Sequence, residues 1–125
     1  MSSNAESGAR AKARTKKWLE EFGYLVADME KVYWIQTPRG RLPVKRDQLG
    51  ADLLAVLPAV GLRCPGPYPF TSEMVFVQVK SGVSARGGTF PSARRVFAAF
   101  PVTAVAQQAV VAWPPRARQP RIVVM

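Results

Sequence analysis

The segments GADLLAVL (residues 50–57) and MVFVQVK (residues 74–80) decide the fold, because both have the apolar character of buried strands in a central sheet. Asp52 lies at the start of the first segment, and Gln78 and Lys80 close the second. Alternation along a strand places Gln78 and Lys80 on one face and the neighbouring valines on the other. A carboxylate, an amide oxygen and an ammonium at neighbouring strand ends are suited to hold a divalent metal beside a scissile phosphate.

The composition predicts one domain, 1–125, with a single core, since 48% of the 125 residues are hydrophobic. No apolar run approaches the roughly 18 residues that span a bilayer, so no membrane partner is expected. The N-terminus has no apolar signal core, which predicts a cytoplasmic protein. The single cysteine, Cys64, lies in a proline-rich stretch and is expected to be a structural or surface thiol.

The absence of histidine excludes a Ser-His-Asp triad, a histidine base and a histidine zinc site. Acid–base or metal chemistry must therefore use the eight Asp and Glu residues, together with lysines. The formal net charge of +10 points to a polyanionic partner, with nucleic acid before an acidic membrane surface. Beyond residue 52 the chain holds only one carboxylate, that of Glu73.

The patterning predicts an α/β protein with a central mixed β-sheet flanked by helices. A helix is expected over residues 3–22, capped by Ser3 and Glu6, and a second, capped by Ser92, from Ala93 to about Phe100. A further helical piece is expected from Pro101 to Gln108. The expected strands are 24–27, 32–36, 41–45, 51–57, 74–80, 109–113 and 121–125.

Two stretches are expected to be irregular, a proline-rich connection at 58–72 and a glycine-rich loop at 81–91. The closing strand 121–125 either completes the sheet or provides the edge of a homodimer. Large aromatic side chains are expected in the core rather than stacked on bases: Trp34, Phe97, Phe100 and Trp113.

Basic side chains in two regions are candidate DNA contacts, because arginine and lysine neutralise phosphates and a helix start adds its own dipole. The alternative is an ordinary solvated surface. The candidates are Arg10, Lys12, Arg14 and Lys17 on the first helix, and Arg86, Arg94 and Arg95 in the loop and second helix.

The strand-end residues suggest a mechanism for phosphodiester hydrolysis. Asp52 and Gln78 would supply oxygen ligands to the metal, and the backbone carbonyl of Val79 a third. Lys80 would position the attacking water or stabilise the developing charge. The alternative is structural, in which Asp52 bonds a neighbouring loop while Gln78 and Lys80 reach solvent.

These residues also resemble a known family. Asp52 in Gly-Ala-Asp-Leu-Leu-Ala, then Gln78-Val79-Lys80-Ser81-Gly82, preceded by a basic helix ending in Phe22-Gly23-Tyr24, is similar to the PD-(D/E)XK nuclease superfamily. The closest branch is that of the Holliday junction resolvase-like and phage-encoded nucleases, and the resemblance covers roughly residues 8–113.

The resemblance implies a restriction-endonuclease-like core and a Mg²⁺- or Mn²⁺-dependent endonuclease that acts on branched or junction DNA in recombination. It implies Asp52 and Gln78 as metal ligands, Lys80 as the catalytic lysine and Asp47 as an auxiliary ligand. It also implies a homodimer, and the host cytoplasm as location if a phage encodes the protein.

The chain departs from the family pattern at two positions. Gln78 replaces the commoner Glu, and Lys12 stands where the family usually has a Glu in the first helix. The alternative function is therefore a basic DNA-binding protein on the same scaffold, with weak or lost catalysis. A carboxylate from the first helix beside Asp52 would favour the nuclease, and Lys12 alone would favour the binding protein. An RNA-associated protein is a third possibility, although no RNP-type aromatic motif is present.

Overall fold

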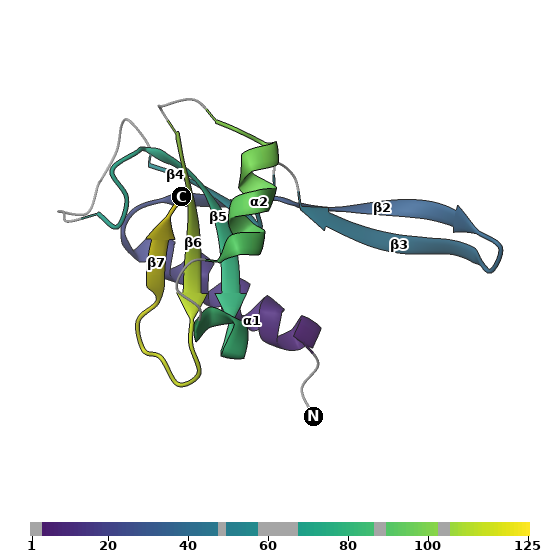
Figure 1. Ribbon diagram of the computed structural model, residues 1–125, viewed down its shortest axis with the longest axis horizontal. Coiled ribbons are helices and arrows are strands. Elements are labelled where there is room, and N and C mark those ends of the chain that lie inside the picture. The colour runs from purple at the N-terminus through teal and green to yellow at the C-terminus, as the bar shows by residue number, and fades with distance from the viewer. Residues whose placement is uncertain (1–3, 48–49, 58–67, 87–89, 103–105) are drawn as a thin grey trace.

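The computed structural model describes residues 4–47, 50–57, 68–86, 90–102 and 106–125. Two α-helices surround a mixed sheet, as the patterning predicts, and a separate hairpin extends from it (Figure 1). In chain order the elements are α1 (Asn4–Glu21), β1 (Leu25–Asp28), β2 (Glu30–Thr37), β3 (Gly40–Asp47), β4 (Leu53–Val56), β5 (Met74–Ser81), the 3₁₀ helix η1 (Gly82–Arg86), α2 (Pro91–Ala99), β6 (Ala106–Trp113) and β7 (Arg121–Val124).

The main sheet has the strand order β1-β4-β5-β6-β7. Among the strands that the structure describes, β5 and β6 form the only parallel pair, which α2 connects, and the other neighbours are antiparallel. The strands β5 and β6 are buried on both faces, which explains their nearly unbroken apolar sequences. The closing strand β7 completes the sheet at one edge, and the other edge is β1.

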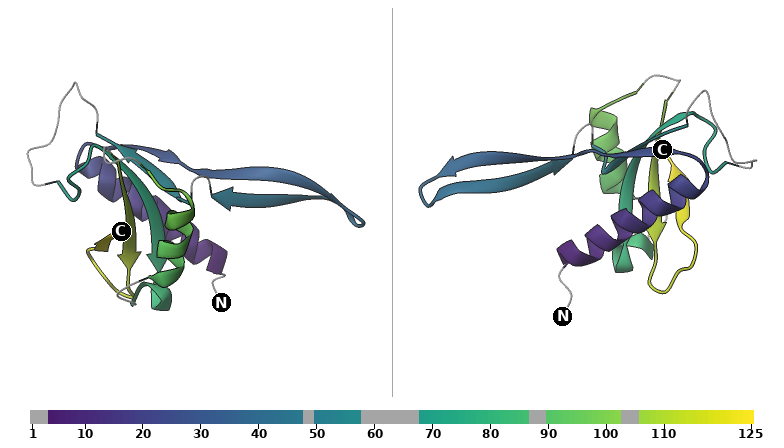
Figure 2. Two further views of the ribbon diagram at one scale, coloured as in Figure 1. Left: turned by 45° about the horizontal axis from the view of Figure 1, so that its top comes forward. Right: turned by 180° about the vertical axis from the view of Figure 1, so that it is seen from behind.

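The two helices cover opposite faces of this sheet (Figures 1 and 2). On the α1 face, Leu19 packs in one cluster with Val77 and Val111. On the α2 face, Phe97 packs with Phe76, while Ala93 packs with Val110. Successive residues of β5 and β6 therefore point to opposite helices, as strand alternation requires.

Several local expectations are wrong. The chain after β5 forms η1 rather than a loop, and Ala106–Gln108 begin strand β6 rather than end a helix. Ser92 does not cap α2, because the helix begins at Pro91, whose fixed φ and missing N–H suit the first turn. The Ser3–Glu6 cap and residues 58–67 of the proline-rich connection lie outside what the structure describes.

The aromatic residues divide between core and surface. Phe97 and Trp113 are buried, as expected, with 1% and 5% of their surface exposed. Trp34 and Phe100 are 59% and 42% exposed, so their assignment to the core was wrong. Among the described strands β2 pairs only with β3, and this two-stranded sheet leaves Trp34 largely open to solvent.

Candidate functional site

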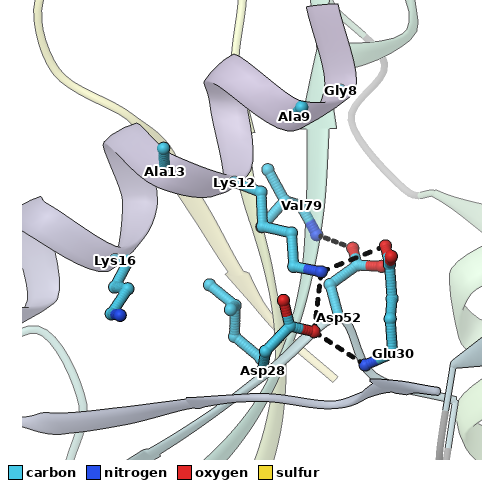
Figure 3. Close-up of a pocket in the computed structure, with 10 residues that line it drawn as sticks. Gly8, Ala9, Lys12, Ala13, Lys16, Asp28, Glu30, Asp52 and Val79 are labelled. Carbon is cyan, nitrogen blue, oxygen red and sulfur yellow. Dashed lines mark hydrogen bonds and ion pairs between the residues drawn. The ribbon is translucent and has the colours of Figure 1, made fainter. Parts of the chain in front are cut away.

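A pocket of about 580 Å³ lies between the N-terminal half of α1 and the ends of several strands (Figure 3). It is found where the β2–β3 hairpin leaves the main body. Three of the six carboxylates whose side chains are described line it, although the protein as a whole is strongly basic. The lining residues are Gly8, Ala9, Lys12, Ala13, Lys16, Asp28, Glu30, Asp52, Leu53 and Val79.

Helix α1 positions Lys12 over this pocket. Ala11, Thr15 and Leu19 recur at four-residue spacing and are buried against the sheet, which fixes the rotation of the helix. Lys12 comes directly after Ala11, the first residue of this stripe, and only 16% of its side chain is exposed. Its ammonium reaches across the pocket toward the strand ends.

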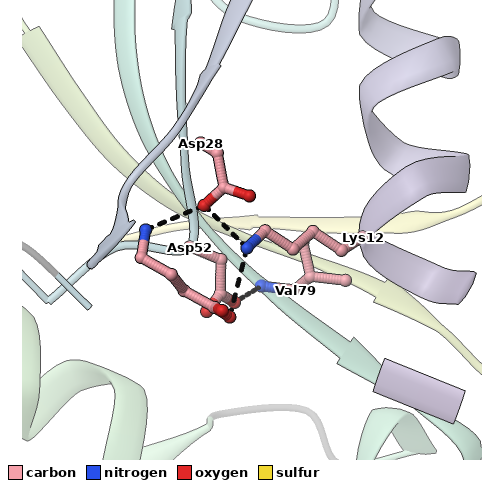
Figure 4. A network of polar contacts seen from close by, with 5 residues as sticks. Lys12, Asp28, Asp52 and Val79 are labelled. Atoms are coloured by element: carbon pink, nitrogen blue, oxygen red, sulfur yellow. Dashed lines mark hydrogen bonds and ion pairs between the residues drawn. The ribbon is translucent and has the colours of Figure 1, made fainter. Parts of the chain in front are cut away.

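Lys12 forms two ion pairs there (Figure 4). Its Nζ lies 2.8 Å from Asp28 Oδ1 and 3.1 Å from Glu30 Oε1. Burial alone lowers the pKa of Lys12, but the hydrogen bonds and charges of the two carboxylates outweigh it, so its pKa is raised. Lys12 is therefore held as a cation at every ordinary pH.

The turn from β1 to β2 orients the two acids. Asp28 Oδ1 also accepts a hydrogen bond from the backbone N–H of Glu30 at 2.8 Å, a local bond typical of aspartate at a turn. Residues 28 and 30 flank Met29, whose N–H donates to the carbonyl of Asp52 at 2.9 Å. The β1–β2 junction is thereby tied to the beginning of β4.

Asp52 points into the same pocket because strand alternation breaks at this residue. Ala51 packs on the α2 face and Leu53 on the α1 face. Alternation from Leu53 would direct Asp52 to the α2 face, but Asp52 lines the pocket on the α1 side together with Leu53. Its N–H donates to the carbonyl of Val77 at 2.8 Å, and its Oδ2 accepts from the N–H of Val79 at 2.7 Å. This local bulge turns the carboxylate toward Lys12.

Gln78 lies on the opposite face of the sheet. Its neighbours Val77 and Val79 pack toward α1, so alternation directs Gln78 toward α2. Its Nε2 donates to the carbonyl of Gly50 at 2.7 Å, and the residue is 7% exposed. Asp52 and Gln78 therefore point to opposite faces of the sheet, and the expectation that they share a metal stays a prediction.

The other expected site residues are dispersed. Lys80 follows the alternation of Gln78, is partly exposed, and is not among the residues that line the pocket. Val79 lines the pocket and gives its N–H to Asp52, and the proposed role of its carbonyl stays a prediction. Asp47 ends β3 opposite Glu30, and its side chain is outside the described part of the chain.

The expected DNA-contacting residues also fall into different settings. Arg10 and Lys17 are exposed on α1, and Arg86, Arg94 and Arg95 are exposed on η1 and α2. Arg14 is held against the body: its guanidinium lies 4.1 Å from the centre of the Trp113 ring and donates to the carbonyl of Ala117 at 2.7 Å. Lys12 is occupied by its ion pairs and is not a free phosphate contact.

Asp28 and Glu30 are the pocket residues that the sequence interpretation missed. The signal was an acidic pair, two residues apart, at the end of a short strand. Alternation would have placed both on one face, but their partner, Lys12, is 16 residues away from Asp28 along the chain. Only the packing of α1 brings that partner close.

Among the described residues, no set of three or more Asp, Glu, Cys or His side chains has an arrangement that would hold a metal ion. None of the helices in the described part is both long and apolar enough to cross a membrane. Comparisons with family models, curated proteins and solved structures found no match to this chain.

Proposed function

We propose that this protein binds DNA through its exposed cationic surface. The observation that carries the proposal is an imbalance of exposed charge: twelve exposed basic side chains stand against four exposed carboxylates in the described residues. The basic residues are Arg10, Arg14, Lys16, Lys17, Arg39, Arg41, Arg86, Arg94, Arg95, Arg116, Arg118 and Arg121. The carboxylates are Glu20, Glu21, Asp28 and Glu73.

The presence of Lys12 beside Asp52 supports binding over catalysis. A nuclease of the resembled kind would have a carboxylate from the first helix at this place. Here the helix supplies an ammonium, which already occupies Asp28 and Glu30, and Asp52 is engaged by the N–H of Val79. A cation at this position competes with a metal ion for the same oxygens.

The experiment measures affinity for a labelled duplex and a labelled four-way junction by fluorescence anisotropy at several salt concentrations. The logarithm of the association constant should fall linearly with the logarithm of salt, with a slope of about −0.9 per phosphate contact. An association constant that does not change with salt, or no binding at low salt, would refute the proposal.

Two double variants then locate the binding face, because α1 and α2 cover opposite faces of the sheet (Figure 2). Arg10→Gln with Lys17→Gln neutralises α1, and Arg94→Gln with Arg95→Gln neutralises α2. The double variant on the binding face should lower the affinity and reduce the salt slope by about 2, and the other double variant serves as its matched control.

A second candidate function is metal-dependent cleavage of DNA, probed on branched substrates. The observation that favours it is that Asp28, Glu30, Asp52 and Lys12 line one pocket. Carboxylates are the oxygen donors that Mg²⁺ and Mn²⁺ use, and a lysine can stabilise charge at a phosphate. As they stand, Asp28, Glu30 and Asp52 do not form a metal site, and Lys12 would have to release Asp28 and Glu30 before a metal could use their oxygens. A metal bound there would supply charge neutralisation and a polarised water.

The test is cleavage of labelled four-way junction, flap, single-stranded and duplex DNA with Mg²⁺ or Mn²⁺. Asp52→Asn retains an oxygen that can accept from Val79 but removes the charge. Loss of cutting in Asp52→Asn with normal cutting in Lys80→Ala would place catalysis in the pocket. Loss in both would implicate the Gln78-Val79-Lys80 motif, and no cutting by the wild type would exclude the enzyme under these conditions.

A further inference from the structure

The β2–β3 hairpin forms an arm that extends away from the main body (Figures 1 and 2). Its strands pair from Glu30 with Asp47 to Thr37 with Gly40, and they form a sheet of their own. The tip is well braced: Thr37 Oγ1 donates to the carbonyl of Gly40 at 2.7 Å and accepts from the N–H of Arg39 at 3.2 Å. Gly40 has φ of 114°, a conformation that favours glycine.

The arm exposes large apolar side chains to an unusual extent. Trp34 is 59% exposed, Leu42 47% and Ile35 42%. A two-stranded ribbon buries little apolar surface by itself and is only marginally stable in water. An exposed tryptophan on such a ribbon therefore indicates a surface that a partner covers.

One face of the arm combines Trp34 with cationic and polar groups. The register pairs Trp34 with Pro43 and Gln36 with Arg41, and neighbouring pairs two residues apart share a face. The guanidinium of Arg41 lies 5.6 Å from the centre of the Trp34 ring. The indole is thus oriented by a neighbouring cation and still presents most of its surface to solvent.

The charge of the arm favours an anionic partner. Its sequence holds five basic residues, Lys31, Arg39, Arg41, Lys45 and Arg46, against Glu30 and Asp47, a net charge of +3. Two such arms would repel each other, which argues against a second copy as the occupant. Pro43 also removes one N–H from β3, and this weakens the strand as an edge for pairing with another chain.

We infer that the Trp34 face of the arm stacks on unpaired bases of a nucleic acid, with Arg41 and Arg39 at the adjoining phosphates. The inference rests on the proposed DNA binding and names the part of the substrate that the arm takes. An exposed aromatic ring beside arginines is the combination used to hold unstacked bases, because every base offers a π-face. A continuous duplex hides these faces, whereas single strands, flaps and branch points expose them.

The experiment compares a labelled oligo-dT with a blunt-ended linear duplex of the same charge, by fluorescence anisotropy at one salt concentration. Trp34→Ala should weaken binding to oligo-dT by about 5- to 150-fold, the range expected for loss of one stacked base. Trp34→Phe, which keeps an aromatic face, should recover most of that loss. Binding of the blunt-ended linear duplex should change by less than about twofold.

The matched control is Leu42→Ala, which removes an apolar side chain of similar exposure from the other face of the arm. It should leave binding to oligo-dT unchanged. An equal loss in Leu42→Ala and Trp34→Ala would overturn the stacking inference, and so would an equal effect of Trp34→Ala on duplex and single strand. A concentration-dependent dimer in sedimentation that Trp34→Ala abolishes would assign the arm to a second copy instead.

These outcomes separate the two proposals. If the wild type binds neither DNA, the proposed function fails and the inference with it. If the wild type binds both DNAs with a normal salt slope, and Trp34→Ala binds both as well as the wild type does, DNA binding stands and only the stacking inference is wrong. Because Trp34 lies on an arm outside the main sheet, a circular dichroism spectrum unchanged by the substitution confirms that the body is folded.

Discussion

Replacing Lys12 by methionine tests whether the charged cluster in the pocket stabilises the fold. Methionine retains most of the apolar stem of lysine but cannot pair with Asp28 or Glu30. The substitution leaves two carboxylates facing each other beside Asp52 without their shared cation. We expect the free energy of unfolding to fall.

The size of the effect follows from exposure. A solvent-exposed ion pair is worth about 0–1 kcal/mol, whereas removing one partner of a buried pair costs about 3–5 kcal/mol. The Lys12 side chain is only 16% exposed, but those of Asp28 and Glu30 are 62% and 30% exposed, so solvent screens both contacts. We therefore expect a loss of about 1–2 kcal/mol.

Urea denaturation followed by circular dichroism measures this loss, with Lys16→Met as the matched control. Lys16 lies one turn further along α1 and lines the same pocket, but makes no ion pair in the described part of the chain. Its replacement should change stability by less than about 0.5 kcal/mol. If Lys12→Met costs no more than Lys16→Met, the ion pairs contribute nothing net and the reasoning is refuted.

The pH dependence gives a second check with a definite sign. Because the folded state raises the pKa of Lys12 above its ordinary value of 10.5, the contribution of Lys12 is fully present below that pH. It is lost as the pH rises through the higher folded-state pKa. The difference in stability between wild type and Lys12→Met should therefore shrink only in strongly alkaline solution.

Three further substitutions test the packing around the site. Thr15→Val should cost about 1–3 kcal/mol in urea denaturation, because Thr15 Oγ1 accepts the buried indole N–H of Trp113 at 2.7 Å; an unchanged midpoint would contradict this. Gln78→Glu should lower the melting temperature at neutral pH, because the substitution places a carboxylate against the carbonyl of Gly50. Added Mg²⁺ should not restore the melting temperature, and a Mg²⁺-dependent rise would show that residue 78 reaches a metal. Gly50→Ala should destabilise by about 1–3 kcal/mol, since Gly50 has φ of 72° and a Cβ would lie 2.6 Å from Val96 Cγ1; a neutral result would show that α2 can shift to accommodate it.

The sequence was sufficient to predict most of the helices and strands, because their patterns are strong. Helix α1 has a regular buried stripe of Ala11, Thr15 and Leu19, and the central strands β5 and β6 are largely apolar. The order of elements and the mixed sheet follow from these signals. The 3₁₀ helix η1 and the start of β6 were missed, since glycine-rich and alanine-rich stretches have weak periodicity.

The composition of the site was harder to predict. Alternation predicts that Gln78 and Lys80 share a face. The side taken by Asp52 depends on a bulge, which shifts a side chain to the other face without any change in hydrophobic pattern. Lys12 was noted as a departure from a family pattern, and its partners could be identified only after α1 had been packed on the sheet. A tryptophan is usually expected in a core, and only the separate pairing of β2 with β3 shows that Trp34 is largely exposed among the described residues.

The distribution of charge connects the two proposed functions. The pocket side chains Lys12, Lys16, Asp28, Glu30 and Asp52 sum to a formal charge of −1, within a protein of net charge +10. A phosphate is therefore drawn to the outer surface and the arm rather than into the pocket. A divalent cation bound in the pocket would change the charge of the pocket from negative to positive, so the pocket would then attract the same phosphate. DNA binding that persists in EDTA, together with cutting that requires both a divalent metal and the Asp52 carboxylate, is the behaviour that this arrangement implies for an active nuclease. Binding in EDTA without cutting in either metal is the behaviour that it implies for a protein that only binds.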